Sequence, residues 1–173
     1  AVTGSLDRKL FGPSIQPYRD EAKPYRRLFQ GPLDGEGRRS IYLKITRMEG
    51  PRFLETFDFP APLQTRGNRD VTNVPSQSLA LLNDPFVVSQ AKAWGARLVA
   101  NGSKDSVAQR LNGIFETALS RRASTEELDR FQALIQALAR ERAIPEVQVL
   151  SDGLLWKDVV HAVFNMKEFV YLR

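Results

Sequence analysis

Seven polar side chains between residues 58 and 83 have the types needed to bind a ligand or to transfer a proton. They are Asp58, Arg66, Arg69, Asp70, Asn73, Gln77 and Asn83. Two carboxylates beside arginines can position a ligand or act as an acid–base pair. The same residue types also hold loops in place, because arginine–carboxylate pairs and amide side chains satisfy backbone polar groups. The sequence leaves both roles open and favours the structural one.

Arg38 and Arg39 form a second candidate site. Two adjacent guanidinium groups could hold an acidic glycan or a phosphate, although a solvated or aspartate-paired role is the more common use of such a pair. The only histidine, His161, lies on an apolar segment with Asp158 three residues before it and Asn165 four residues after it. It could carry a proton, but the pattern favours a hydrogen-bonded structural histidine.

The composition excludes several classes of site. The chain of 173 residues has no cysteine, which removes disulfides, thiolate nucleophiles and the Cys-x-x-Cys-His haem attachment motif. One histidine excludes the usual zinc arrangements within one chain, and the serines lack a nucleophile-elbow context. We therefore expect no catalytic residues, no metal site and no cofactor in this chain.

The charge and hydropathy patterns limit the partners. The formal net charge is +5, which permits anionic partners but does not demand them. Acidic and basic residues are interleaved, with no basic block and no glycine-rich aromatic RNA motif, so the sequence argues against nucleic-acid binding. No apolar run is long enough to span a bilayer. Because the chain opens at Ala1 without an initiator methionine, we interpret it as a piece of a larger protein.

Two prolines predict where the polar side chains sit. Pro75 suits the first turn of a helix, with Thr72 or Asn73 as the capping residue, and this helix should end near Asn83. Pro85 repeats the signal after Asp84, whose carboxylate should cap the new helix at a sharp corner.

Three further helices are predicted after the helix that starts at Pro85, which should run to about residue 101 and close at Gly102. Ser103 should begin the next one. Ser124 and Glu127 form a capping box for a helix that continues to about residue 142. Asp152 should cap the last helix. Its apolar residues cover more than one face, which predicts a central, buried position: Leu155, Trp156, Val159, Val160, Val163 and Phe164.

Residues 1–72 show no sustained helical period. We expect an extended strap at residues 12–18, anchored through Leu10, Phe11, Ile15 and Tyr18, followed by an exposed loop at residues 24–37. Residues 39–48 are predicted to form a short strand or an extended segment, and residues 53–63 to be extended chain. These two segments could pair as a hairpin around residues 49–51.

The fold class predicted from these elements is mainly α. A single domain should contain a helical core of about five helices in residues 73–173. Residues 1–72 should form an irregular strap on the same domain, with at most a small β-hairpin.

Five of these segments, taken in order, resemble one known family. They are residues 37–47 (GRRSIYLKITR), 57–62 (FDFPAP), 69–87 (RDVTNVPSQSLALLNDPFV), 118–128 (ALSRRASTEEL) and 156–173 (WKDVVHAVFNMKEFVYLR). They are similar to the C-terminal domain of unknown function of large exported planctomycete proteins, the PSD-type module associated with cytochrome c domains. The resemblance covers nearly the whole chain.

The resemblance implies a setting rather than an activity. It implies an exported protein, in the periplasm or cell envelope, with a haem c module and a helical domain elsewhere in the parent chain. The leading hypothesis is a non-catalytic module that docks neighbouring domains or a partner. The alternative is a domain that binds or processes polysaccharide through Asp58, Asp70 and the nearby arginines. A third hypothesis is plain anion binding driven by net charge.

Overall fold

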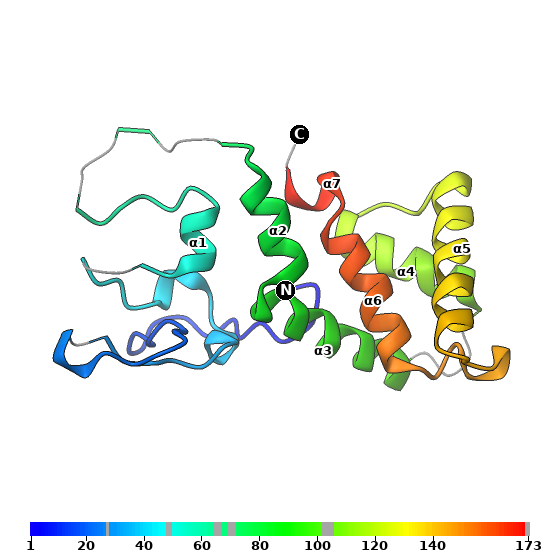
Figure 1. Ribbon diagram of the computed structural model, residues 1–173, viewed down its shortest axis with the longest axis horizontal. Helices are drawn as coiled ribbons and strands as arrows, with labels where there is room; N and C mark the ends of the chain where they lie inside the picture. Colours follow the sequence, from blue (N-terminus) through cyan, green and yellow to red (C-terminus); the bar gives the residue numbers. More distant parts are fainter. Residues whose placement is uncertain (27, 48–49, 64–66, 69–71, 102–105, 172–173) are drawn as a thin grey trace. The chain divides into compact units, whose positions relative to one another are not determined.

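The computed structural model describes residues 1–26, 28–47, 50–63, 67–68, 72–101 and 106–171. The chain divides into two compact units. We call residues Ala1–Gly4 and Val88–Arg173 the helical unit, and residues Ser5–Val87 the irregular unit. The mainly α class predicted from the sequence is confirmed, since the regular elements of the described residues are helices (Figure 1).

The helical unit contains most of α3 (Pro85–Asn101), then α4 (Val107–Leu119), α5 (Thr125–Glu141), the short 3-10 helix η4 (Glu146–Gln148), α6 (Gly153–Phe164) and α7 (Lys167–Val170). The α6 helix packs against α4, α5 and α7. All six apolar residues expected to cover it are buried. The predicted central position of this helix is therefore confirmed, and Figure 1 shows it among the other helices of the unit.

The helices of this unit begin where polar side chains satisfy their first amides. Ser124 and Glu127 form the predicted capping box of α5, and Asp152 accepts hydrogen bonds from two amides at the start of α6. The predicted start at Ser103 is wrong for α4, which begins at Val107. Its cap is Ser106, whose box is completed by Gln109, so the serine nearest the apolar stripe fixes the start.

Helix α3 packs closely against α6 at Gly95. A Cβ atom added to Gly95 would lie 2.6 Å from the backbone nitrogen of Lys157 and 2.9 Å from the carbonyl oxygen of Gly153. Only a residue without a side chain allows the two backbones to come this close. Next to it, Trp94 is buried and stacks on Phe164 with ring centroids 5.6 Å apart.

The irregular unit contains the 3-10 helices η1 (Pro24–Arg26), η2 (Gly35–Gly37) and η3 (Ser40–Tyr42), together with α1 (Arg52–Thr56) and α2 (Pro75–Asn83). At residues 39–48 the predicted strand is absent from the described residues, because η3 occupies residues 40–42, but the extended alternative holds at Leu43 (φ −68°, ψ 133°). The extended reading of residues 53–63 is also wrong at its start, which lies in α1. The hairpin is absent from the described part of the chain, where only isolated backbone bridges occur.

The strap at residues 12–18 is held differently from the prediction. Ile15 is buried and exchanges hydrogen bonds with the backbone of Tyr42 and Lys44. Leu10 and Phe11, expected as anchors, are exposed, Phe11 at 81%. The loop expected to be exposed at residues 24–37 contains Leu28, which is 1% exposed. Sequence spacing cannot separate such residues, because an irregular chain has no repeating buried face.

Helix α2 starts at Pro75 and ends at Asn83, as predicted. The predicted cap is wrong: Val74 is the capping position and makes no side-chain bond to the helix. At the other end, Asp84 is extended (φ −65°, ψ 127°) and accepts a hydrogen bond from the amide of Phe86 at 2.9 Å. The predicted corner and the predicted cap of α3 are both confirmed. Gly102 lies outside the described residues.

Candidate functional site

Asp58, Thr72 and Gln77 form a chain of hydrogen bonds in the irregular unit. The backbone amide and the hydroxyl of Thr72 both donate to the Asp58 carboxylate, each at 2.8 Å. The buried side chain of Gln77 donates to the Thr72 hydroxyl at 3.2 Å. Thr72 therefore fixes the approach to α2 instead of capping it. Both carboxylate oxygens of Asp58 accept hydrogen bonds from Thr72. Asp58 therefore has the structural role that the sequence favoured for this group of polar residues.

The other members of the predicted group do not join this chain. Asn83 donates its side-chain amide to the carbonyl of Leu79 in its own helix. Asn73 is exposed and has an interaction partner. Arg66, Arg69 and Asp70 lie outside the described residues, so the separation of the Asp58 and Asp70 carboxyls stays open.

Arg38 and Arg39 have unlike surroundings although they are neighbours. The Arg38 guanidinium donates to the carbonyls of Phe11 and Pro13 and lies over the ring of Tyr42, 3.8 Å from its centroid. Arg38 thus ties the strap to η3, a role that neither sequence reading included. Arg39 is exposed and makes no side-chain hydrogen bond or ion pair within the described part of the chain.

His161 does not assemble a site with its predicted neighbours. Asn165 donates to the backbone carbonyl of His161, not to its ring. Asp158 pairs instead with Lys157 at 2.7 Å and with Arg142. Burial raises the pKa of Asp158, but the hydrogen bonds from Lys157 and Arg142 outweigh it, and the net pKa is lowered.

Arg121 forms a second charged cluster in the helical unit. Its guanidinium donates to both oxygens of Glu127 and to both oxygens of Glu168. Its hydrogen bonds lower the pKa of Glu127 to about 2, with the amide of Ser124 adding to the effect. The carboxylates in turn raise the pKa of Arg121. This clamp joins the start of α5 to α7 and offers no open position to a ligand.

A pocket of the irregular unit is the concave site that the sequence does not reveal. Its volume is about 290 Å³. Apolar side chains from four separate segments line it, including Leu33, Leu43, Phe53 and Phe86. The rings of Phe53 and Phe86 are 5.7 Å apart. Residues 18–20, 32–43, 50–54 and 84–86 all contribute, and no sequence period connects segments so far apart.

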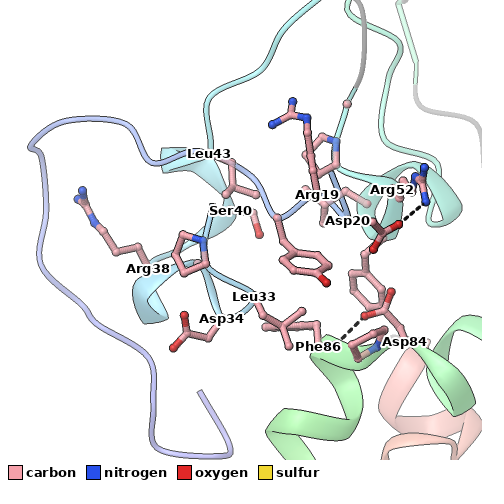
Figure 2. Close-up of a pocket in the computed structure, with 18 residues that line it drawn as sticks. Arg19, Asp20, Leu33, Asp34, Arg38, Ser40, Leu43, Arg52, Asp84 and Phe86 are labelled. Carbon is pink, nitrogen blue, oxygen red and sulfur yellow. Dashed lines mark hydrogen bonds and ion pairs between the residues drawn. The ribbon is translucent and has the colours of Figure 1, made fainter. Parts of the chain in front are cut away.

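Among the described residues, the charged groups that line this pocket are three arginines and three aspartates. Figure 2 shows Asp20, Arg52 and Asp84 on one side, with Ser40 and Leu43 on the other. Arg19, which is 6% exposed, donates to the carbonyl of Phe29 at 2.9 Å. Arg52 pairs with Asp20 at 2.8 Å. The arginines are thus turned toward protein acceptors.

The described residues contain no group of three or more histidine, cysteine, aspartate or glutamate side chains placed to hold a metal ion. None of their helices is long and apolar enough to cross a membrane.

The fold and the pocket together define a mainly α protein with a small aromatic-lined pocket. Comparison with protein families identifies the family: residues 1–135 match PSD1, described as a protein of unknown function (DUF1553). The match covers more than half of the chain, so the chain belongs to this family. The comparisons with curated proteins and with solved structures found no match.

Proposed function

We propose that this chain is a non-catalytic docking module of an exported multidomain protein, and that it binds a neighbouring domain or a partner through the irregular unit. The observation that carries this proposal is the uneven distribution of exposed apolar side chains. Among the described residues, fourteen large apolar side chains are exposed, of which eleven lie in residues 5–87 and three in the helical unit. Contiguous exposed apolar surface marks protein interaction sites, and two of the eleven residues, Leu79 and Leu82, lie together on α2.

Helix α2 presents part of this surface. Leu79 is 58% exposed and Leu82 is 50% exposed. They are three residues apart on the helix and therefore lie on the same side. Gln77, which points into the unit, is buried. A helix that turns a polar residue inward and two leucines outward is suited to docking an apolar partner surface.

The polar groups of the irregular unit support binding over catalysis. Asp58 gives both of its oxygens to Thr72, and Arg38 gives its guanidinium to backbone carbonyls. A general acid or base needs a proton acceptor or donor facing the substrate. These groups face their own chain instead.

Amide hydrogen exchange tests the docking role. Exchange is compared between the 173-residue chain alone and the same residues within the longer natural polypeptide. We expect the amides of α2 to gain protection in the longer polypeptide. Changing Leu79 and Leu82 to lysine should remove this gain, while Leu154→Lys, at a similarly exposed site of the helical unit (59%), should not. Equal exchange in both contexts would refute the proposal.

An immunoblot of fractionated cells tests the setting. An antibody against residues 125–141 should detect a band far above 19.5 kDa in the envelope or periplasmic fraction. Staining the same gel for haem peroxidase activity should mark that band if a covalently bound haem c lies in the parent chain. A band of about the size of this chain, or a cytoplasmic band, would count against the multidomain or the exported part of the proposal respectively.

Binding of an anionic polysaccharide is the second candidate, and exposed aromatic residues favour it. Tyr25 is 79% exposed and has the guanidinium of Arg26 5.4 Å from its ring centroid. A ring beside a cation can stack on a sugar and pair with its carboxylate. Electrophoresis in gels containing alginate should show retardation that Tyr25→Ala abolishes. Mobility that is the same with and without alginate would exclude this candidate.

A further inference from the structure

The charged side chains of the pocket in the irregular unit determine which kind of ligand it can bind. Its described lining residues include three arginines and three aspartates. What a ligand meets depends on which of these groups still have free hydrogen-bonding atoms that face the pocket.

The arginines are engaged with the protein. Arg19 donates to the carbonyls of Phe29 and Pro17, and Arg38 donates to those of Phe11 and Pro13. In Figure 2 the guanidinium groups of both residues lie away from Asp84 and Phe86. Arg52 pairs with Asp20. A ligand carboxylate would have to compete with these partners.

The aspartates keep free acceptors. Asp84 uses Oδ1 for the amide of Phe86, and Asp20 uses Oδ2 for Arg52. The second oxygen of each carboxylate accepts no hydrogen bond from the described part of the chain. Figure 2 shows both carboxylates on the same side of the pocket, that of Asp20 beside Arg52 and that of Asp84 beside Phe86.

The apolar side chains that line the pocket suit a ligand with a methylene chain and a cationic head group. Tyr18, Phe53 and Phe86 supply aromatic rings, and Leu33 and Leu43 supply aliphatic surface. Aromatic faces attract ammonium and guanidinium groups, and aliphatic walls cover their methylene stems. A volume of about 290 Å³ suits one side chain better than an oligosaccharide.

We propose that this pocket receives the side chain of an arginine or lysine presented by a protein partner. The stem lies against Leu33, Phe53 and Phe86, and the cationic head lies by the free oxygens of Asp20 and Asp84. This proposal rests on the proposed docking role, because a partner protein must supply the basic residue. It adds that the partner carries an exposed arginine or lysine.

Peptide titrations followed by amide chemical shifts test the proposal without any natural partner. The probes are three capped tripeptides, Gly-Arg-Gly, Gly-citrulline-Gly and Gly-Glu-Gly, added to the whole chain. Citrulline has the shape of arginine without its charge. We expect saturable shifts of the Phe53 and Phe86 amides with the arginine peptide only. Equal binding of the citrulline peptide, tighter binding of the glutamate peptide, or no saturable binding would overturn the proposal.

Two matched variants test the role of the carboxylate. Asp84→Asn keeps an oxygen that caps α3 and removes the charge, so the fold is retained. It should weaken binding of the arginine peptide about threefold, as for the loss of one partly exposed charge pair. Asp7→Asn is the control, because Asp7 also accepts a backbone amide two residues ahead, that of Lys9, and lies outside the pocket. An equal loss in both variants would mean general charge attraction and would overturn the proposal.

Failure of this test and failure of the docking role can be told apart. If the arginine peptide does not bind but α2 is protected in the longer polypeptide, the docking surface exists and the pocket takes no basic side chain. If the peptide binds and α2 gains no protection, the pocket chemistry holds and the proposed interface on α2 is wrong.

Discussion

The helical unit and the irregular unit are held together by different interactions. In the helical unit, apolar side chains of α3, α4, α5 and α6 form a buried core, and capping residues such as Ser124 and Asp152 fix where helices begin. In the irregular unit, arginines donate to backbone carbonyls that no helix or sheet satisfies. Regular structure satisfies its own backbone, whereas irregular chain needs side chains for this purpose.

This difference has a functional consequence. The helical unit buries many of its large apolar residues in a core, and among its described residues only Val147, Leu154 and Tyr171 are exposed large apolar side chains. The irregular unit leaves such residues outside and encloses a pocket. We therefore expect binding in the irregular unit and stability in the helical unit, and the following predictions test that division.

The largest effect should come from Trp156→Ala in the helical unit. The Trp156 ring is fully buried, its indole nitrogen donates to the carbonyl of Val149 at 2.9 Å, and Arg110 lies over it. Removing it should lower the free energy of unfolding by about 3–5 kcal/mol, as for other large core truncations. Urea unfolding followed by circular dichroism measures this. An unchanged transition would show that α6 is not the core of its unit.

Gly95→Ala should cause the next largest loss in the free energy of unfolding. The added methyl group would meet the backbone of α6, which cannot move aside as a side chain can, and we expect a loss of about 1–3 kcal/mol. Gly113→Ala is the control, because a Cβ there meets nothing within 4 Å. In the middle of α4 it should stabilise by about 0.5–1 kcal/mol. Thermal melts of the two variants should therefore shift in opposite directions.

Arg38→Gln should loosen the irregular unit and leave the helical unit in place. It removes two charge-assisted hydrogen bonds and the contact with Tyr42, a loss of about 2 kcal/mol. Amides of residues 11–18 should exchange faster. Both tryptophans lie in the helical unit, so the transition seen by tryptophan fluorescence should stay unchanged. Arg39→Gln, at an exposed site, should change neither, and a shifted tryptophan transition in Arg38→Gln would show that the units unfold together.

Asp84→Ala removes the cap of α3 and should cost about 1 kcal/mol. The amide of Phe86 loses its acceptor, and the positive end of the helix loses a carboxylate. Urea unfolding of this variant beside Asp84→Asn separates the two effects, because the asparagine keeps the acceptor. Equal losses in both variants would mean that the charge, not the hydrogen bond, stabilises the corner.

The smallest effect should be a pH dependence confined to the helical unit. The pKa of Glu127 is lowered from 4.5 to about 2 in the folded chain. Its contribution is therefore complete above about pH 4.5 and is lost as the pH falls toward 2. With solvent screening the contribution should stay below about 1 kcal/mol. Glu127→Gln, which keeps the capping box, should be less stable than the natural chain at pH 7 and equal to it near pH 2; a difference that persists near pH 2 would exclude the ion pair as its cause.

Some of the fold could be predicted from local residue order. Proline, serine and aspartate determine helix starts through one or two nearby bonds, so the starts at Pro75, Pro85, Thr125 and Gly153 follow from the sequence. The buried face of α6 follows from the spacing of its apolar residues. These features depend on neighbours within one or two turns of helix.

The tertiary structure alone determined the rest. Arg38 binds carbonyls 25 and 27 residues away, and Gly95 meets a helix that lies about sixty positions further along the chain. The pocket joins four segments that share no period. The sequence alone predicted the polar residues but could not say whether Asp58 would face a ligand or Thr72. That choice is made by long-range packing, because the same carboxylate can satisfy either partner.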